Sequence, residues 1–248
     1  MSALILALAA GAVIGLALGA LGGGGSVLAV PALIYLLGFT PAAATTASLI
    51  IVTATSATAL YAHASSGNVR WKTGALFAAV GIPPAIAAAA LAGRVPEALL
   101  TAAFAAIALL AALALFRAPT PDRQPSAVRP ARAAGAGVGL GAVTGFLGVG
   151  GGFLAVPALV SVLGLRMRAA VGTSLLVITV NSLAALVARA GTHTALNWAV
   201  IAPFTGAAIL GAWDGKRLAA KISGPALQRA FASVLLAVAA LMVTDALH

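Results

Sequence analysis

Two short runs of glycine carry the clearest chemical signal in this sequence. Gly22–Gly25 and Gly150–Gly152 interrupt long apolar stretches, and each run leads into another apolar segment. Backbone N–H groups and the helix dipole make the start of such a segment a natural seat for an anion. We therefore predict an anion-binding site that contains these residues: Gly22, Gly24, Gly25, Ser26, Gly148, Gly150, Gly151 and Gly152.

Close packing between helices is the alternative use of glycine in an apolar sequence. The ladder Gly11, Gly15 and Gly19, with its copy at 137, 141 and 145, is typical of that use. Pro31 and Pro157 follow the two runs, and we expect them to bend or interrupt a helix. In lipid such a break persists only where protein buries it or where it lines a polar cavity.

The segment after each broken element is unusually polar for its apolar surroundings. We predict that Ser48, Ser174 and Asn181 line a pathway for the bound solute. The alternative for the hydroxyls is a bond to the backbone of their own helix. His63 and Arg189 end these two segments, and we favour side chains that reach the outer membrane surface.

The acidic residues exclude several other kinds of site. All four lie at segment ends or in the central loop: Glu97, Asp122, Asp214 and Asp245. No paired carboxylates, metal-ligand spacing or nucleophile–base set is present, and the chain has no cysteine. The sequence thus predicts no catalytic residues, no metal site, no cofactor and no enzyme activity.

Composition indicates that the solvent of this chain is lipid. Of its 248 residues, 62% are hydrophobic and only 7% are charged, whereas a soluble domain is about one quarter charged. A spanning helix needs about 20 residues, so we predict an all-α bundle of roughly eight to ten spans. The net charge of +10 lies in short loops between apolar runs, which argues against nucleic-acid binding.

An internal repeat divides the chain. Residues 11–33 match residues 137–159 at 13 of 23 positions, including the glycine ladder and the proline. Shared small-residue composition does not explain an aligned ladder. We predict a first membrane repeat at 1–116, a cytoplasmic linker loop at 117–133 and a second membrane repeat at 134–248.

Basic residues predict how the repeats lie in the membrane. If each glycine-broken segment enters and returns, 12 of the 14 basic residues face one side, and only Arg94 and Arg189 face the other. The positive-inside rule then places the central loop in the cytoplasm and both termini outside, in the cytoplasmic membrane. Each repeat makes an odd number of crossings, so the two repeats are inverted. The expected helices are 3–21, 27–38, 42–63, 73–92, 97–116, 134–148, 153–164, 169–189, 197–214 and 225–246. The short ones at 27–38 and 153–164 are either re-entrant or tilted spans.

The segments LGGGGSVLAVPAL at 21–33 and LGVGGGFLAVPAL at 147–159 resemble the TauE/SafE (TSUP) family of sulfite exporters. The likeness extends over essentially the whole chain. It implies a transporter for sulfite, sulfoacetate or another small organic anion, while the copies differ where Val149 replaces Gly23.

We therefore predict a secondary transporter that moves a small anion across the cytoplasmic membrane by alternating access. A cation or neutral-solute carrier and a non-transporting assembly partner remain alternatives. The expected partners are the lipid bilayer and the anion, and the sequence leaves open a coupling ion and a homo-oligomer.

Overall fold

The computed structural model describes residues 2–92, 97–118, 130–147, 152–188 and 196–246, and these parts are helical wherever they have regular structure. The elements are α1 (Ser2–Leu21), α2 (Gly24–Pro31), η1 (Ala32–Leu36), α3 (Pro41–Ala64), α4 (Trp71–Ala92), α5 (Glu97–Arg117), α6 (Pro130–Leu147), α7 (Gly152–Ser161), α8 (Met167–Ala188), α9 (Trp198–Lys221) and α10 (Gly224–Ala246). Four of these described helices, α1, α3, α8 and α10, are long and apolar enough to cross a membrane.

The predicted all-α fold is confirmed, and two helix ends differ from expectation. Helix α6 begins at Pro130, inside the predicted linker, because proline suits the first position of a helix. Helix α9 continues to Lys221 although its hydropathy falls after Trp213. Gly215 and Ala219 are buried on its inner face, so packing maintains the helix past the apolar stretch.

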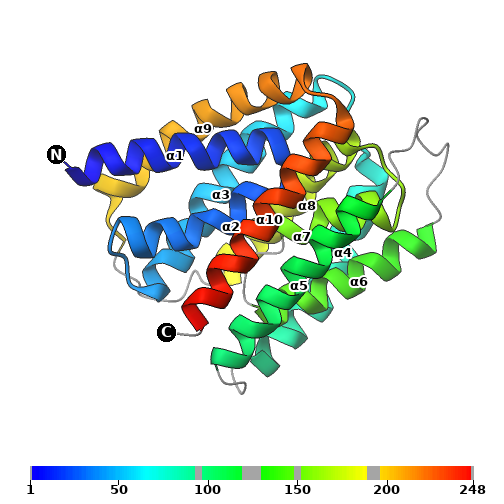
Figure 1. Ribbon diagram of the computed structural model, residues 1–248, viewed down its shortest axis with the longest axis horizontal. Coiled ribbons are helices and arrows are strands. Elements are labelled where there is room, and N and C mark those ends of the chain that lie inside the picture. The colour runs from blue at the N-terminus through cyan, green and yellow to red at the C-terminus, as the bar shows by residue number, and fades with distance from the viewer. Residues whose placement is uncertain (1, 93–96, 119–129, 148–151, 189–195, 247–248) are drawn as a thin grey trace.

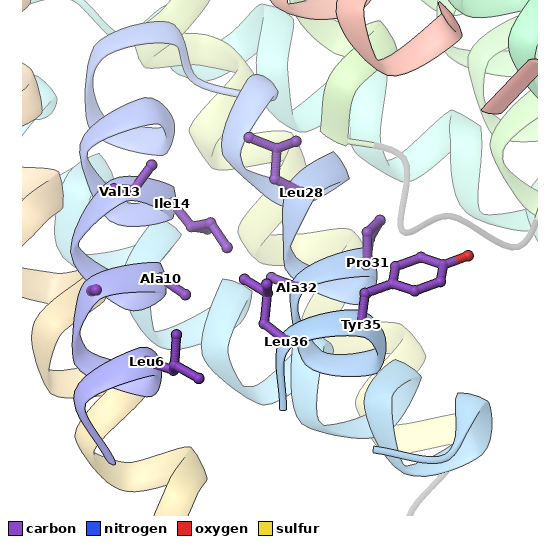
Figure 2. Close-up of a pocket in the computed structure, with 10 residues that line it drawn as sticks. Leu6, Ala10, Val13, Ile14, Leu28, Pro31, Ala32, Tyr35 and Leu36 are labelled. Carbon is purple, nitrogen blue, oxygen red and sulfur yellow. The ribbon is translucent and has the colours of Figure 1, made fainter. Parts of the chain in front are cut away.

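The first glycine run forms the bend of a helical hairpin. Gly22 has φ +72°, a left-handed conformation that glycine adopts without steric cost. Beyond it, α2 and η1 return along α1, so that Leu28 lies near Ile14 and Leu36 lies near Leu6 (Figure 2). The π-helical turn η1 follows Pro31 directly, so the hydrogen-bond pattern of the helix changes there. The equivalent Pro157 lies inside α7, and the helix continues past it to Ser161.

The two halves of the chain exchange their helices. The first helix of each half packs on the fourth helix of the other half, as α1 with α9 and α4 with α6. The remaining pairs obey the same exchange: α3 contacts α8, α5 contacts α10, and α2 contacts α7. In Figure 1, α1 and α9 lie side by side along one edge, while α4, α5 and α6 group at the other. The sequence halves are therefore not separate bodies.

Glycine contacts reproduce this exchange residue by residue. Gly11 meets the backbone of Phe204 and Gly15 that of Ala208. In the other half Gly137 meets Phe77, and Gly141 meets Gly81. The contact residues in the two interfaces are related by the same alignment that defines the sequence repeat: 126 positions for the first helix and 127 for the fourth. The ladders are thus packing surfaces, as their spacing predicts.

The two polar helices α3 and α8, which are equivalent in the repeat, run antiparallel. Asn68, just after α3, contacts Gly172 near the start of α8, and Ser56 and Thr179 meet at mid-helix. A rotation that exchanged the two halves of the chain would therefore place α3 on α8, and its axis would lie perpendicular to both helices.

The described basic residues gather at one end of the bundle. They lie at the starts of α4, α6, α8 and α10 and at the ends of α5 and α9. Contacts join these ends: Arg168 donates to the carbonyls of Ala220 and Ile222, and Gln228 donates to those of Leu115 and Ala118. Helix α1 begins and α10 ends on the opposite side, at the left of Figure 1.

Candidate functional site

The bend at Gly22 brings the first half of the chain against the second. A Cβ on Gly22 would lie 2.5 Å from Oγ of Ser174 on α8 and 3.2 Å from Val156 on α7. Gly22 and Ser174 are both buried. Two predicted site residues from opposite halves thus meet at the start of α2.

The start of α7 comes close to this bend. Val156 is four residues from Gly152, the first residue of α7, which corresponds to about 6 Å along a helix. Because α2 begins and α7 ends toward the basic end, the two short helices lie side by side and antiparallel. Their N-termini are therefore offset, rather than directly opposed. Gly148, Gly150 and Gly151 lie outside the described residues.

Gly25 packs rather than lining open space. A Cβ there would lie 2.6 Å from the carbonyl of Ile14 and 2.6 Å from Cβ of Leu18, both on α1. The space beside Gly25 is therefore filled by α1, the other helix of the hairpin. Gly24 and Ser26 belong to the first turn of α2, whose N–H groups have no partner within an α-helix.

Most hydroxyls of the polar helices bond their own backbone. Oγ of Ser48 donates to Thr45 and Oγ of Ser174 donates to Val171, each at 2.8 Å. Thr55 and Thr58 bond their own helix in the same way. These are the bonds that the alternative interpretation describes, and they leave the lone pairs of each oxygen free to accept from a donor.

Three buried side-chain oxygens on α3 and α8 have no hydrogen-bond partner. They are Oγ1 of Thr53, Oδ1 of Asn181 and Oγ of Ser182. Beside them the hydroxyls of Ser56 and Thr179 bond each other at 2.9 Å. An unpaired buried polar atom costs about 1–3 kcal/mol, so this crossing is a place where a polar ligand or water would be stabilised.

Asn181 was predicted to line the pathway, as one of the polar residues of these two segments. The hydroxyls around it are repeated between the segments, because Thr53 matches Thr179 and Ser56 matches Ser182 at the common spacing of 126. The sequence alone did not indicate that these two helices pack on each other.

His63 does not reach the membrane surface, and that expectation is wrong. Its side chain is 3% exposed, and its Nε2 lies 3.0 Å from the carbonyl oxygen of Gly19 on α1. Because a carbonyl only accepts, Nε2 carries the proton, and the buried Nδ1 is left without a partner. The close approach of α3 to the end of α1 buries the imidazole. Arg189, its equivalent, lies outside the described residues.

A separate apolar groove opens between α1 and the returning α2–η1 segment (Figure 2). Its volume is about 450 Å³. Leu6, Val13, Leu28 and Leu36 are among its lining residues, and Tyr35 is the one lining side chain with a polar group. A charged solute would lose its hydration there without compensation, so this groove is not the anion site.

Metal-ligating and charged side chains are sparse in the described parts of the chain. No group of three or more His, Cys, Asp or Glu side chains is close enough there to hold a metal ion. Arg217 and Asp214 form an exposed pair at 3.3 Å on α9. Such a surface pair contributes little.

The helical fold and its long apolar helices define a polytopic membrane protein. The family described as sulfite exporter TauE/SafE matches residues 7–242. The chain therefore belongs to the TauE/SafE family. Two relatives from Xylella fastidiosa, strains Temecula1 and 9a5c, are each described as "Probable membrane transporter protein". Each is 33% identical over 244 residues, which cover 95% of this chain and 93% of the relative. No solved structure matches the chain.

Proposed function

We propose that this protein is a secondary transporter that carries a small anion, of the sulfite or sulfonate type, across the cytoplasmic membrane. The observation that carries the proposal is the buried meeting of Gly22 with Ser174, at the start of a helix inside a membrane bundle. There the anion would accept hydrogen bonds from the N–H groups of α2 and from nearby hydroxyls. Family membership and the names of the two relatives support transport.

Three features recommend an anion over a cation. The described part of the membrane core offers no buried carboxylate to balance a cation. Helix N-termini carry positive partial charge. The basic end of the bundle raises the local concentration of anions near the entrance on that side. Under the positive-inside rule this end is cytoplasmic, which places both chain termini outside.

The packing indicates which parts would move. Helix α1 packs on α9 and α4 packs on α6. Movement of one sequence half against the other would therefore disrupt both of these interfaces. The moving bodies would instead combine helices from both halves, with the α3–α8 crossing between them. In this proposal the two inverted repeats supply alternating access around a central site.

Uptake of sulfur-labelled sulfite or sulfoacetate into proteoliposomes tests the proposal. We expect saturable uptake, and we expect Ser174→Val to reduce it at least tenfold, because the larger apolar side chain presses on Gly22 and removes a hydroxyl that can donate to the anion. The matched control is Thr205→Val on α9, whose hydroxyl bonds the carbonyl of Ile201 on its own helix.

Each result has a defined meaning when both variants retain the thermal stability of the original protein in detergent. Loss of uptake in Ser174→Val with normal uptake in Thr205→Val supports the site. Equal uptake by both variants would remove Ser174 from the pathway. Uptake of labelled cations but of no anion would replace the proposal with the cation-carrier alternative.

A further inference from the structure

The α3–α8 crossing contains one hydrogen bond where the repeat provides for two. Thr53 and Ser56 on α3 are equivalent to Thr179 and Ser182 on α8. Exchange of the two halves turns the pair Ser56–Thr179 into the pair Ser182–Thr53. These are therefore the same contact, viewed from either half of the molecule.

The two copies of this contact are in different states. Ser56 and Thr179 are hydrogen-bonded at 2.9 Å. Thr53 and Ser182 each have a buried oxygen with no partner. A symmetric crossing would satisfy all four hydroxyls or none. Of the two equivalent contacts, the structure thus has one hydrogen-bonded and the other not.

The unsatisfied pair is costly, because Thr53 and Ser182 lack every bond that their counterparts make. Thr179 bonds both Ser56 and the carbonyl of Leu175, and Ser56 also bonds the carbonyl of Thr53 on its own helix. A small rotation of α3 against α8 would close the open side while it separates the closed side. The two arrangements exchange one hydrogen bond for an equivalent one. Their free energies are therefore close, as a cycle between two states requires.

We propose that Thr53 and Ser182 form the alternative latch of the transporter, which closes when the Ser56–Thr179 bond opens. The inference rests on the proposed transport function, because it identifies the two latched states with the two directions of access. In a transporter built from inverted repeats, the inward-facing state becomes the outward-facing state when the two repeats exchange conformations. All four side chains act as positioning residues, since they set which side of the crossing is closed.

The absence of cysteine from the chain makes a direct test simple. Two double variants, S56C/T179C and T53C/S182C, are reconstituted in proteoliposomes and oxidised with copper phenanthroline, with and without sulfoacetate. A disulfide requires Cα atoms within about 7 Å, so each pair reports whether its side of the crossing is closed. Sulfoacetate is the probe because sulfite itself cleaves disulfides.

Reciprocal variants separate a latch from ordinary packing. Ser182→Ala removes the alternative latch, so we expect it to increase crosslinking of S56C/T179C. Thr179→Val removes the present latch, so we expect it to increase crosslinking of T53C/S182C. The loss of one hydrogen bond inside a membrane protein shifts such a balance roughly threefold. A purely structural role would leave the opposite pair unchanged or make it less reactive.

Measurement of sulfoacetate uptake distinguishes the latch proposal from the proposed transport function. Crosslinking of either pair should stop sulfoacetate uptake, and reduction should restore it, which also excludes misfolding. Crosslinking of T53C/S182C that stays absent in every condition, in a protein that transports, would overturn the latch and leave transport intact. Both disulfides forming at once in a quadruple variant would likewise overturn it. Exchange between the pairs without any anion uptake would retain the latch and remove the proposed function.

Discussion

The glycine interfaces and the α3–α8 crossing both obey the exchange of halves, yet they are built from opposite materials. Where α1 meets α9, backbone lies on backbone: a Cβ on Gly15 would overlap the carbonyl of Ala208. Where α3 meets α8, small polar side chains lie between the helices, and some of their oxygens have no partner. The α1–α9 contact has no free space between its backbones, whereas the α3–α8 contact has polar atoms without hydrogen bonds.

This difference separates the parts that must stay together from the part that can change. A close-packed helix pair has one good register, because any slip brings atoms into overlap. A crossing with a spare hydroxyl pair has a second arrangement of similar energy. We therefore interpret α1–α9 and α4–α6 as rigid arms and α3–α8 as the adjustable joint between them.

The largest expected effect lies in a rigid arm. Gly141→Leu places a side chain against the backbone of Gly81 on α4, whereas a Cβ on Gly139, in the same helix, would meet no neighbouring atom within 4 Å. We expect Gly141→Leu to destabilise the protein by about 3 kcal/mol or more and to abolish monodisperse protein in detergent. Gly139→Leu is the matched control and should change the apparent melting temperature little. Similar behaviour of the two variants would show that the arms are not close-packed.

The second-largest effect is expected from substitution of Gly22, at the bend that joins α1 to the proposed site. Gly22→Ala introduces a side chain at φ +72° and within 2.5 Å of Oγ of Ser174. The backbone conformation alone costs about 1–2 kcal/mol. We expect anion uptake to fall at least tenfold and the melting temperature to decrease.

Ser174→Ala in the Gly22→Ala background divides that effect into two parts. Removal of the hydroxyl relieves the steric overlap but leaves the backbone strain, so stability should recover in part. Stabilities of the single and double variants measure the coupling. Additive losses would show that Gly22 and Ser174 do not touch.

Sequence reasoning identified the first broken element because its residues are chemically distinctive. Four consecutive glycines have few other uses in a membrane helix, and the repeat contains a second glycine run at the equivalent place. Helix positions followed from the apolar stretches, and most predicted ends agree closely with those of the structure. The basic residues predicted which helix ends meet, since each loop lies at one surface of the bilayer or the other.

Pairing between helices was not predictable in the same way. Helices such as α1 and α5 are apolar on all faces, so no amphipathic stripe indicates the neighbour of each. The ladder on α1 shows that a close partner exists, but any small-residue face would serve, and the partner lies in the other half of the chain. Burial of His63 and the unpaired state of Thr53 depend on that pairing and on helix rotation, so they were out of reach.

A moderate loss of stability is expected from substitution of His63, whose hydrogen bond links α3 to the end of α1. His63→Leu removes the donor to the Gly19 carbonyl and leaves that buried oxygen without its partner, which should cost about 1–3 kcal/mol. His63→Gln supplies an amide N–H that can take the same place, so it should lose less. Thermal unfolding in detergent measures both. Equal losses would show that the imidazole contributes volume rather than the hydrogen bond.

The smallest expected effect distinguishes the joint from its surroundings. Ser56→Ala removes a bond between two helices, whereas Ser48→Ala removes a bond within one helix. Interhelical hydrogen bonds in membrane proteins contribute about 0.6 kcal/mol on average, so Ser56→Ala should lower stability by roughly that amount and Ser48→Ala by less. Because the freed Thr179 still bonds the carbonyl of Leu175, no new unpaired group appears on α8. A loss several times larger, measured by thermal unfolding, would mean that the crossing is packed as rigidly as the arms, and the comparison between arm and joint would fail.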